Sequence, residues 1–363
     1  MTDFPTHAAL KLDVVVIGAG QAGLSSAYHL KKLGLVPGRN FIVLDEAQKP
    51  GGAWQFRWPS LTLSTVNRVH DLPGLGFAQY AGGNETAKAS VAVPRYFSAY
   101  EEHFDLKVLR PAKVTVVCDR GDRLRIESVR GLFSVRGIIN ATGTWENPFI
   151  PVYPGADNFT GQTLHTKDFR TAEAFAGRHV LIVGGGISAI QLLDQISQVT
   201  RTSWVTRTPP RWRDGPFDED AGRKAVAMVE ERVRAGLPPR AVVSVTGLPV
   251  TPAIVSMRKR GVLDRQPMFS EITPTGVRWE DGRMLDVDVI LWCTGFRSSL
   301  DHLAPLMLQE ESGGITMTGR LATQVAKDPR VHLVGYGPSA STIGANRAGA
   351  AAARELTSFL NLA

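Results

Sequence analysis

The 363-residue sequence contains little cysteine and no long apolar run. Cys118 and Cys293 are its only cysteines and lie far apart, which excludes a CxxC redox pair and makes a disulfide framework improbable. No window of about 18 uninterrupted apolar residues occurs, and the first residues show neither the basic nor the apolar region of a signal peptide. We therefore expect a soluble, cytoplasmic protein without membrane association, whose chemistry does not depend on sulfur.

Basic runs are also absent, although the formal net charge is +7. Lysine and arginine are spread along the chain without interleaved aromatic residues, which argues against nucleic-acid binding. A basic surface around phosphate-bearing ligands accounts for the charge equally well. With 43% hydrophobic and 21% charged residues, the composition is that of a globular protein, and the length predicts two or three domains.

One strand–helix–strand pattern occurs twice. Leu12–Ile17 is a continuous β-branched run typical of a strand buried in a parallel sheet, residues 22–34 have helical spacing, and Phe41–Glu46 predicts the next strand. The pattern returns over Arg178–Arg207, as HVLIV, then GGGISAIQLLDQISQV, then TSWVTR. Both halves predict a dinucleotide-binding type of α/β unit.

The segments around these units predict how the domains are connected. Apolar and polar residues alternate over Lys107–Gly143 on both sides of a Gly121-Asp122 turn, which predicts an antiparallel hairpin or meander ending in ATG. A similar ending, VILWCTG, occupies Val289–Gly295, and the chain closes with a strand, a turn and a helix. We predict an α/β protein of two Rossmann-like domains in a glutathione-reductase-like arrangement. Residues 1–151 and 295–363 form one discontinuous domain, and residues 152–294 are inserted into it.

A glycine loop follows the first strand directly. Its glycines provide a tight turn, a close approach of backbone to pyrophosphate and close helix packing, and the helix N-terminus faces the anion. The loop residues are Gly18, Gly20, Gln21 and Gly23. Asp45 lies about 20 residues further on, where a carboxylate bonds ribose hydroxyls, and Glu46 is the adjacent alternative.

The second loop departs from the first in two ways. It contains Gly184, Gly186 and Ser188, and Ala189 replaces the third glycine, as the motif permits. The following strand ends in Arg207 and Thr208 instead of an acid. This arrangement suits a ribose 2′-phosphate and predicts NADPH over NADH. Arg211 and Arg213 are alternative donors, and a plain surface arginine at position 207 also remains open.

With these motifs the chain resembles the flavin-containing monooxygenases and related class B flavoprotein monooxygenases over nearly its whole length. The most specific element is FTGQTLHTKDFR, which fits the family fingerprint through Phe159, Gly161, His165 and Phe169. In this family the linker histidine resembles a hinge or cofactor-positioning residue. We therefore do not expect His165 to donate a proton.

The resemblance implies FAD at the first loop, NADPH at the second, and further cofactor contacts. The residues that match are Gly52, Trp54, Thr65, Val114, Ala141, Thr142, Gly143, Thr294, Gly295, Thr342 and Ile343. The N-terminal amides of the last helix, opened by Thr342 and Ile343, are expected to face the electron-rich edge of the flavin. The family's flavin-proximal asparagine falls at Ser64, with Asn67 three residues later, so these two are the catalytic candidates.

The resemblance implies an FAD- and NADPH-dependent monooxygenase with no metal. Such an enzyme transfers one oxygen atom from a flavin C4a-hydroperoxide to sulfur or nitrogen of a small organic substrate, and a homodimer is one expected assembly. Three alternatives stay open. A Baeyer-Villiger monooxygenase usually has tryptophan where Phe169 stands. A plain NADPH-dependent flavin reductase or oxidase would yield peroxide alone, and a noncatalytic redox-sensing module would bind the cofactors without turnover.

Overall fold

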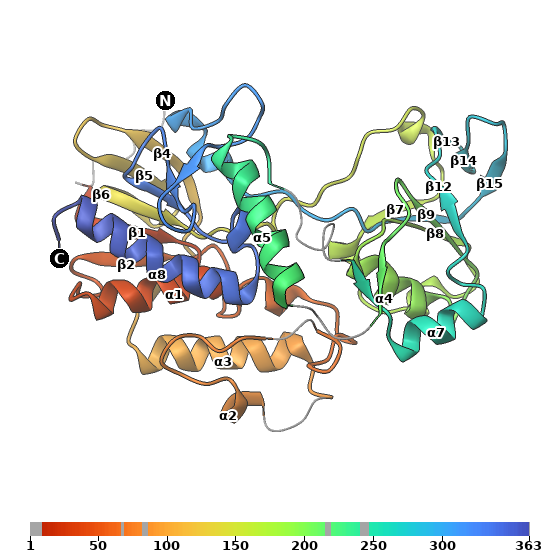
Figure 1. The fold of residues 1–363 in the computed structure, drawn as a ribbon, viewed down its shortest axis with the longest axis horizontal. Helices are drawn as coiled ribbons and strands as arrows, with labels where there is room; N and C mark the ends of the chain where they lie inside the picture. Colours follow the sequence, from red (N-terminus) through yellow and green to blue (C-terminus); the bar gives the residue numbers. More distant parts are fainter. Residues whose placement is uncertain (1–8, 67–68, 82–85, 215–218, 240–246, 363) are drawn as a thin grey trace. The chain divides into compact units, whose positions relative to one another are not determined.

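The computed structural model describes residues 9–66, 69–81, 86–214, 219–239 and 247–362, and Figure 1 shows the fold. The chain forms two compact units. The first contains residues 1–144, 226–241 and 298–363, and the second contains residues 145–225 and 242–297.

The first unit is built on a nine-stranded mixed sheet. The main path runs β17-β18-β19-β6-β1-β2-β3, and β4 and β5 extend β6 as an antiparallel hairpin. From β19 to β3 the neighbouring strands are parallel. The strands are β1 (Leu10–Ile17), β2 (Phe41–Leu44), β3 (Val108–Leu109), β4 (Val114–Asp119), β5 (Leu124–Ser128), β6 (Gly131–Asn140), β17 (Met317–Thr318), β18 (Gln324–Val325) and β19 (Val331–Leu333).

Both faces of this sheet are buried, as the β-branched run in β1 predicts. Val14 and Val16 belong to a core cluster shared with the helices, whereas Val15 and Ile17 belong to a cluster shared with the hairpin. Helices α1 and α8 lie side by side against the sheet (Figure 1), and the Ser25 hydroxyl of α1 donates to the Asn346 carbonyl of α8 at 3.0 Å. The helical segments are α1 (Gln21–Lys32), α2 (Ala78–Ala81), α3 (Ala89–His103), α8 (Thr342–Phe359), η1 (Gly52–Phe56), η5 (Asp301–Leu306) and η6 (Gly337–Ser339).

The second unit contains a parallel sheet of order β12-β9-β8-β16-β7. Its strands are β7 (Gln162–His165), β8 (Val180–Val183), β9 (Thr202–Thr206), β12 (Arg265–Pro267) and β16 (Val289–Trp292). The smaller sheets comprise β10 (Trp212–Arg213) with β11 (Leu248–Pro249), and β13 (Glu271–Thr273), β14 (Gly276–Arg278) and β15 (Met284–Asp286). The helical segments are α4 (Ile187–Ile196), α7 (Pro252–Lys259), η2 (Ala156–Asn158), η3 (Thr166–Asp168) and η4 (Glu173–Phe175).

The division between the units differs from the predicted domain limits in one segment. Helix α5 (Glu219–Arg234) was expected inside residues 152–294, yet residues 226–241 pack with the first unit. Val233 is fully buried there, and a Cβ added to Gly337 would lie 2.9 Å from its side chain. The apolar face of α5 therefore packs in the core of the first unit. The amphipathic pattern predicts that this face is buried, but not in which unit. The other two boundaries differ little. The first segment of the first unit ends at residue 144 instead of the predicted 151, and its last segment begins at residue 298 instead of 295.

In the part of the chain that the structure describes, no helix is both long and apolar enough to cross a membrane.

Candidate functional site

The glycines of the first loop have different neighbours. Gly18 has φ +96°, and a Cβ there would lie 2.6 Å from the Ala141 carbonyl oxygen. A Cβ on Gly23 would lie only 1.9 Å from the Gly18 carbonyl oxygen, so both positions exclude a side chain by packing. A Cβ on Gly20 would meet no described atom within 4 Å, although Gly20 caps α1. The free space lies at the position where a pyrophosphate approaches the helix N-terminus, so this loop fits a dinucleotide.

The acid at the end of β2 lies against the same loop. Asp45 is buried, and its Oδ1 accepts a hydrogen bond from the Ala19 N–H at 3.3 Å. Glu46 pairs instead with Lys113 at 2.6 Å, and both side chains are about half exposed. The geometry favours Asp45 over Glu46 as the ribose ligand. Val114, predicted to contact the cofactor, is the buried first residue of β4.

Gln21 connects the first turn of α1 to two other segments. Its Nε2 donates to the Asn346 Oδ1 at 2.9 Å and to the His70 carbonyl at 3.2 Å. Asn346 Nδ2 in turn donates to the Asp71 carbonyl at 2.6 Å. Because this side-chain network joins segments far apart in the sequence, Asn346 was not found by motif reading.

The PGGAW segment lies against the glycine loop. A Cβ on Gly52, which has φ +51°, would lie 2.9 Å from the Gly20 Cα. Trp54 is half-buried against the core cluster that contains α1. The structure thus brings Gly52 close to Gly20 of the first loop, and the contact of Gly52 and Trp54 with FAD stays a prediction.

The ATG segment ends β6 beside β1. Thr142 Oγ1 donates to the Ser299 carbonyl at 2.7 Å, and the Ser299 N–H donates to the Gly143 carbonyl at 3.0 Å. His302 Nε2 lies 2.8 Å from the Asn140 Oδ1, and burial lowers the pKa of His302 to about 4. A neutral His302 therefore holds Asn140 at this strand end, a contact that sequence reading missed.

The start of α8 is capped and partly open. Ser341 Oγ accepts from the Gly344 N–H at 3.1 Å, Thr342 is partly exposed, and Ile343 is 53% exposed. The preceding GYG turn has φ +72° at Gly335 and +56° at Gly337, conformations that favour glycine. Thr342 and Ile343 thus occupy the first turn of a buried helix, where backbone N–H groups lack helical partners.

Ser64, a catalytic candidate, lies in a turn whose hydroxyl groups form hydrogen bonds with one another. Ser64 Oγ is 2.8 Å from Thr62 Oγ1, and Thr65 Oγ1 is 3.1 Å from the same atom. Both Ser64 and Thr65 are exposed, and Asn67 lies outside the described residues. The local turn accounts for these contacts, and a catalytic role for Ser64 stays a hypothesis.

The second loop repeats the geometry of the first. Gly184 has φ +138°, and a Cβ there would lie 2.3 Å from the Cys293 carbonyl oxygen. A Cβ on Gly186 would meet no described atom within 4 Å, and this residue caps α4. Ser188 is partly exposed in the first turn of α4, and Ala189 is fully buried. The free space at the helix N-terminus again fits a dinucleotide pyrophosphate.

The strand end after this loop is basic. Arg207 and Thr208 are exposed, and the Thr208 carbonyl accepts from Thr206 Oγ1 at 2.8 Å. Arg265 on the neighbouring β12 donates to the Thr206 carbonyl at 2.9 Å. An exposed guanidinium at this position is available to a 2′-phosphate. Arg265 was missed because only the strand order places β12 beside β9.

His165 has both ring nitrogens in hydrogen bonds. Its Nδ1 accepts from the Lys167 N–H at 3.1 Å, which leaves the proton on Nε2, and Nε2 donates to the Gly295 carbonyl at 2.9 Å. Burial lowers the pKa of His165. A buried neutral imidazole with two backbone partners holds the end of β7 near Gly295, which supports a positioning role.

The other fingerprint residues are also packed. A Cβ on Gly161 would lie 2.4 Å from the Phe159 ring, and Phe169 is buried in a stack with Phe175, centroids 5.9 Å apart. Thr294 Oγ1 donates to the Phe149 carbonyl. The fingerprint residues Phe159, Gly161 and Phe169 are thus packed within the second unit.

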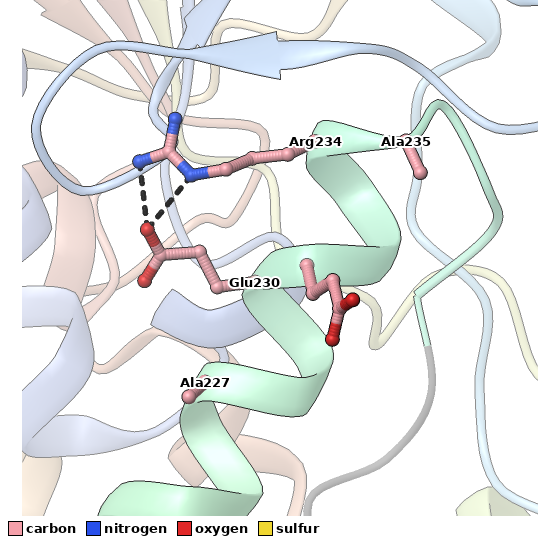
Figure 2. Close-up of a pocket in the computed structure, with 5 residues that line it drawn as sticks. Ala227, Glu230, Arg234 and Ala235 are labelled. Atoms are coloured by element: carbon pink, nitrogen blue, oxygen red, sulfur yellow. Dashed lines mark hydrogen bonds and ion pairs between the residues drawn. The ribbon is translucent and has the colours of Figure 1, made fainter.

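The described part of α5 borders a pocket of about 580 Å³ in the first unit. Figure 2 shows that Arg234 turns to Glu230, which it bonds through Nε at 2.9 Å and Nη2 at 2.7 Å. The lining residues are Ala227, Glu230, Glu231, Arg234 and Ala235. None of them belongs to either loop, and the charged pair is mutually satisfied, so this pocket is not the candidate site.

Comparisons with known proteins agree with this geometry. Residues 15–237 match the model of the pyridine nucleotide-disulphide oxidoreductase family. The solved structure of a flavin-containing monooxygenase from Stenotrophomonas maltophilia is 34% identical with a TM-score of 0.80, over 96% of this chain and 99% of that one. An uncharacterised oxidoreductase, CzcO, of Bacillus velezensis is 25% identical over 85% of this chain and 86% of its own length. A Baeyer-Villiger monooxygenase of Streptomyces coelicolor is 31% identical over 54% of this chain and 38% of its own.

Each glycine loop leaves room for a pyrophosphate and follows a strand whose sheet neighbours are parallel, so the protein has two dinucleotide-binding units. Together with the matched family, these units define a flavoprotein oxidoreductase. The chain belongs to the flavin-containing monooxygenase family. It is an enzyme that uses FAD and NADPH, and the predicted fold class and cofactors are confirmed.

Proposed function

We propose that this protein transfers one oxygen atom from O₂ to the sulfur or nitrogen of a small organic substrate, with NADPH as reductant. The reaction consumes NADPH, a proton, O₂ and the substrate, and yields NADP⁺, water and the oxygenated product. Bound FAD supplies the redox and oxygen chemistry. The open positions at Gly20 and Gly186 support the binding of two dinucleotides. The observation that supports oxygen transfer is the 34% identity to the Stenotrophomonas flavin-containing monooxygenase over 96% of this chain.

We assign FAD to the first unit and NADPH to the second. Asp45 beside Ala19 provides a carboxylate for the FAD ribose, whereas exposed Arg207 provides a cation for the NADPH 2′-phosphate. The remaining predicted contacts at both loops stand as part of the same proposal. So do a cytoplasmic location, a homodimer and the absence of nucleic-acid partners.

Phe169 is a family marker that argues against the Baeyer-Villiger class and so favours soft nucleophiles over ketones as substrates. The Baeyer-Villiger class usually carries tryptophan there, and here the position is filled by a fully buried phenylalanine stacked on Phe175. The matched Streptomyces enzyme also aligns over only 38% of its length, whereas the Stenotrophomonas enzyme aligns over 99%.

The test compares a sulfide with a ketone as substrate and traces oxygen from O₂ into the product. Purified enzyme is given NADPH, isotopically labelled O₂ and either an aryl methyl sulfide or a cyclic ketone, and the products are analysed by mass spectrometry. We expect labelled sulfoxide and little lactone. Efficient lactone formation would place the enzyme in the Baeyer-Villiger class, and hydrogen peroxide alone would make it an NADPH oxidase.

A further inference from the structure

Asp45 is held in place by two backbone hydrogen bonds and two side-chain hydrogen bonds. Its N–H donates to the Leu109 carbonyl at 3.1 Å, and its own carbonyl accepts from the Ala112 N–H at 2.7 Å. Its Oδ1 accepts from Ala19 of the glycine loop, and its Oδ2 accepts from Arg110 Nε at 2.6 Å. The carboxylate is therefore fixed between the loop and the residues that follow β3.

Arg110 gives its stronger contact to a second carboxylate. Its Nη1 and Nη2 donate to the two oxygens of Glu101 on α3, at 2.5 and 2.7 Å. The side chains of Arg110, Asp45 and Glu101 are 9%, 11% and 12% exposed. Burial alone would lower the pKa of Arg110, but the hydrogen bonds and charges of Glu101 and Asp45 raise it above its ordinary value.

The guanidinium of Arg110 binds Glu101 and Asp45 through different nitrogen atoms. A guanidinium forms a bidentate pair with only one carboxylate on a given edge, and Glu101 occupies the Nη1–Nη2 edge. Asp45 is left with a single bond through Nε, on Oδ2. Without Glu101, the Arg110 fork would be free to take both oxygens of Asp45. The Oδ1 of Asp45 therefore has the Ala19 N–H, at 3.3 Å, as its described partner and does not contact Arg110.

We propose that Glu101 and Arg110 are positioning residues that hold Asp45 so that its Oδ1 side remains available to a hydroxyl of the adenosine ribose of FAD. This inference rests on the proposed FAD site at Asp45. Glu101 and Arg110 lie outside both glycine loops, and through Asp45 they set the affinity and the selectivity of cofactor binding.

The experiment measures discrimination between two cofactors. Apoprotein of the full chain is titrated with FAD and with an FAD analogue that lacks the adenosine 2′-hydroxyl, and the melting temperature of each apoprotein is recorded. The wild type should prefer FAD by roughly tenfold or more, because a hydrogen bond to a charged group is lost with the analogue. Glu101→Gln should reduce this preference to about threefold or less.

A matched control makes the same chemical change away from the triad. Glu127→Gln on β5 removes an exposed partner of Arg125 in the same unit and should leave the preference at the wild-type value. If Glu101→Gln weakens FAD and the analogue equally, Glu101 is merely structural and the inference is overturned. If Glu101→Gln does not fold, Arg110→Lys decides, because lysine keeps the charge without the fork.

Asp45→Asn separates this inference from the FAD site on which it rests. Loss of the preference in Asp45→Asn, together with an intact preference in Glu101→Gln and Arg110→Lys, overturns only the positioning role. A full preference retained in Asp45→Asn overturns the assignment of FAD to Asp45.

Discussion

Two glycines of one loop should respond in opposite ways to substitution. Gly23 is packed, because a Cβ there would lie 1.9 Å from the Gly18 carbonyl oxygen, whereas a Cβ on Gly20 would meet no described atom within 4 Å. Ordinary contact begins at 3.4 Å, so Gly23→Ala requires a shift of about 3.4 − 1.9 = 1.5 Å between helix and loop. We expect it to destabilise the protein by about 1–3 kcal/mol or more, as overpacked sites do.

Gly20→Val should leave the apoprotein nearly as stable as the wild type. The backbone at Gly20 has φ −81° and ψ −169°, an extended conformation that valine adopts without strain. A poorer helix cap costs about 1 kcal/mol, and the reduced freedom of the unfolded chain returns about 0.4–1 kcal/mol. The side chain would instead occupy the space of the pyrophosphate. Loss of one charge-assisted hydrogen bond, worth about 1.5–3 kcal/mol, lowers affinity at least tenfold.

The assay compares the flavin-to-protein absorbance ratio of each purified variant with the melting temperature of its apoprotein. Gly20→Val should carry clearly less flavin than the wild type and have an apoprotein melting temperature near that of the wild type, and Gly23→Ala should melt lower. A yellow Gly20→Val with full FAD occupancy would remove FAD from this loop. A Gly23→Ala apoprotein as stable as the wild type would refute the packing argument.

Three further outcomes are expected. Arg207→Ala should raise KM for NADPH about tenfold and leave that for NADH nearly unchanged, because Arg207 is exposed at the end of β9; steady-state flavin reduction with both nucleotides checks this. Burial lowers the pKa of His332 to about 3. Below about pH 6.5 the unfolded chain therefore binds a proton at this histidine that the folded chain does not bind. The free energy of unfolding falls from that pH toward pH 3 by at most about 1.4 kcal/mol per pH unit. His332→Gln should flatten that part of the unfolding profile. Phe169→Trp should overpack the stack with Phe175, costing about 1–3 kcal/mol in denaturant unfolding, without creating ketone oxygenation.

The fold was predictable because its signals are local. The run over Leu12–Ile17 became β1, the helical spacing after it became α1, and the second copy became β8, α4 and β9. The place of helix α5 in the first unit depends on the burial of Val233, which no local sequence pattern indicates.

The site was predictable only where a motif fixes the spacing. Gly18, Gly23 and Asp45 belong to one motif and meet in the structure. Arg110 and Glu101 belong to none, because their nearness to Asp45 follows from the pairing of β3 with β2 and from where α3 ends. The candidate catalytic turn had the weakest signal, and the hydroxyls of Ser64 and Thr65 bond within their own turn.

In each unit the residue before the Thr-Gly pair lies against the first glycine of the loop. In the first unit β6 pairs with β1, so the carbonyl of Ala141 lies under the first loop glycine, 2.6 Å from a Cβ at Gly18. In the second unit β16 pairs with β8, and the carbonyl of Cys293 lies 2.3 Å from a Cβ at Gly184. The first glycine is thus required by the neighbouring strand in both units. The third position differs between the loops: a Cβ at Gly23 would lie 1.9 Å from the Gly18 carbonyl oxygen, whereas Ala189 carries its Cβ fully buried in the second loop.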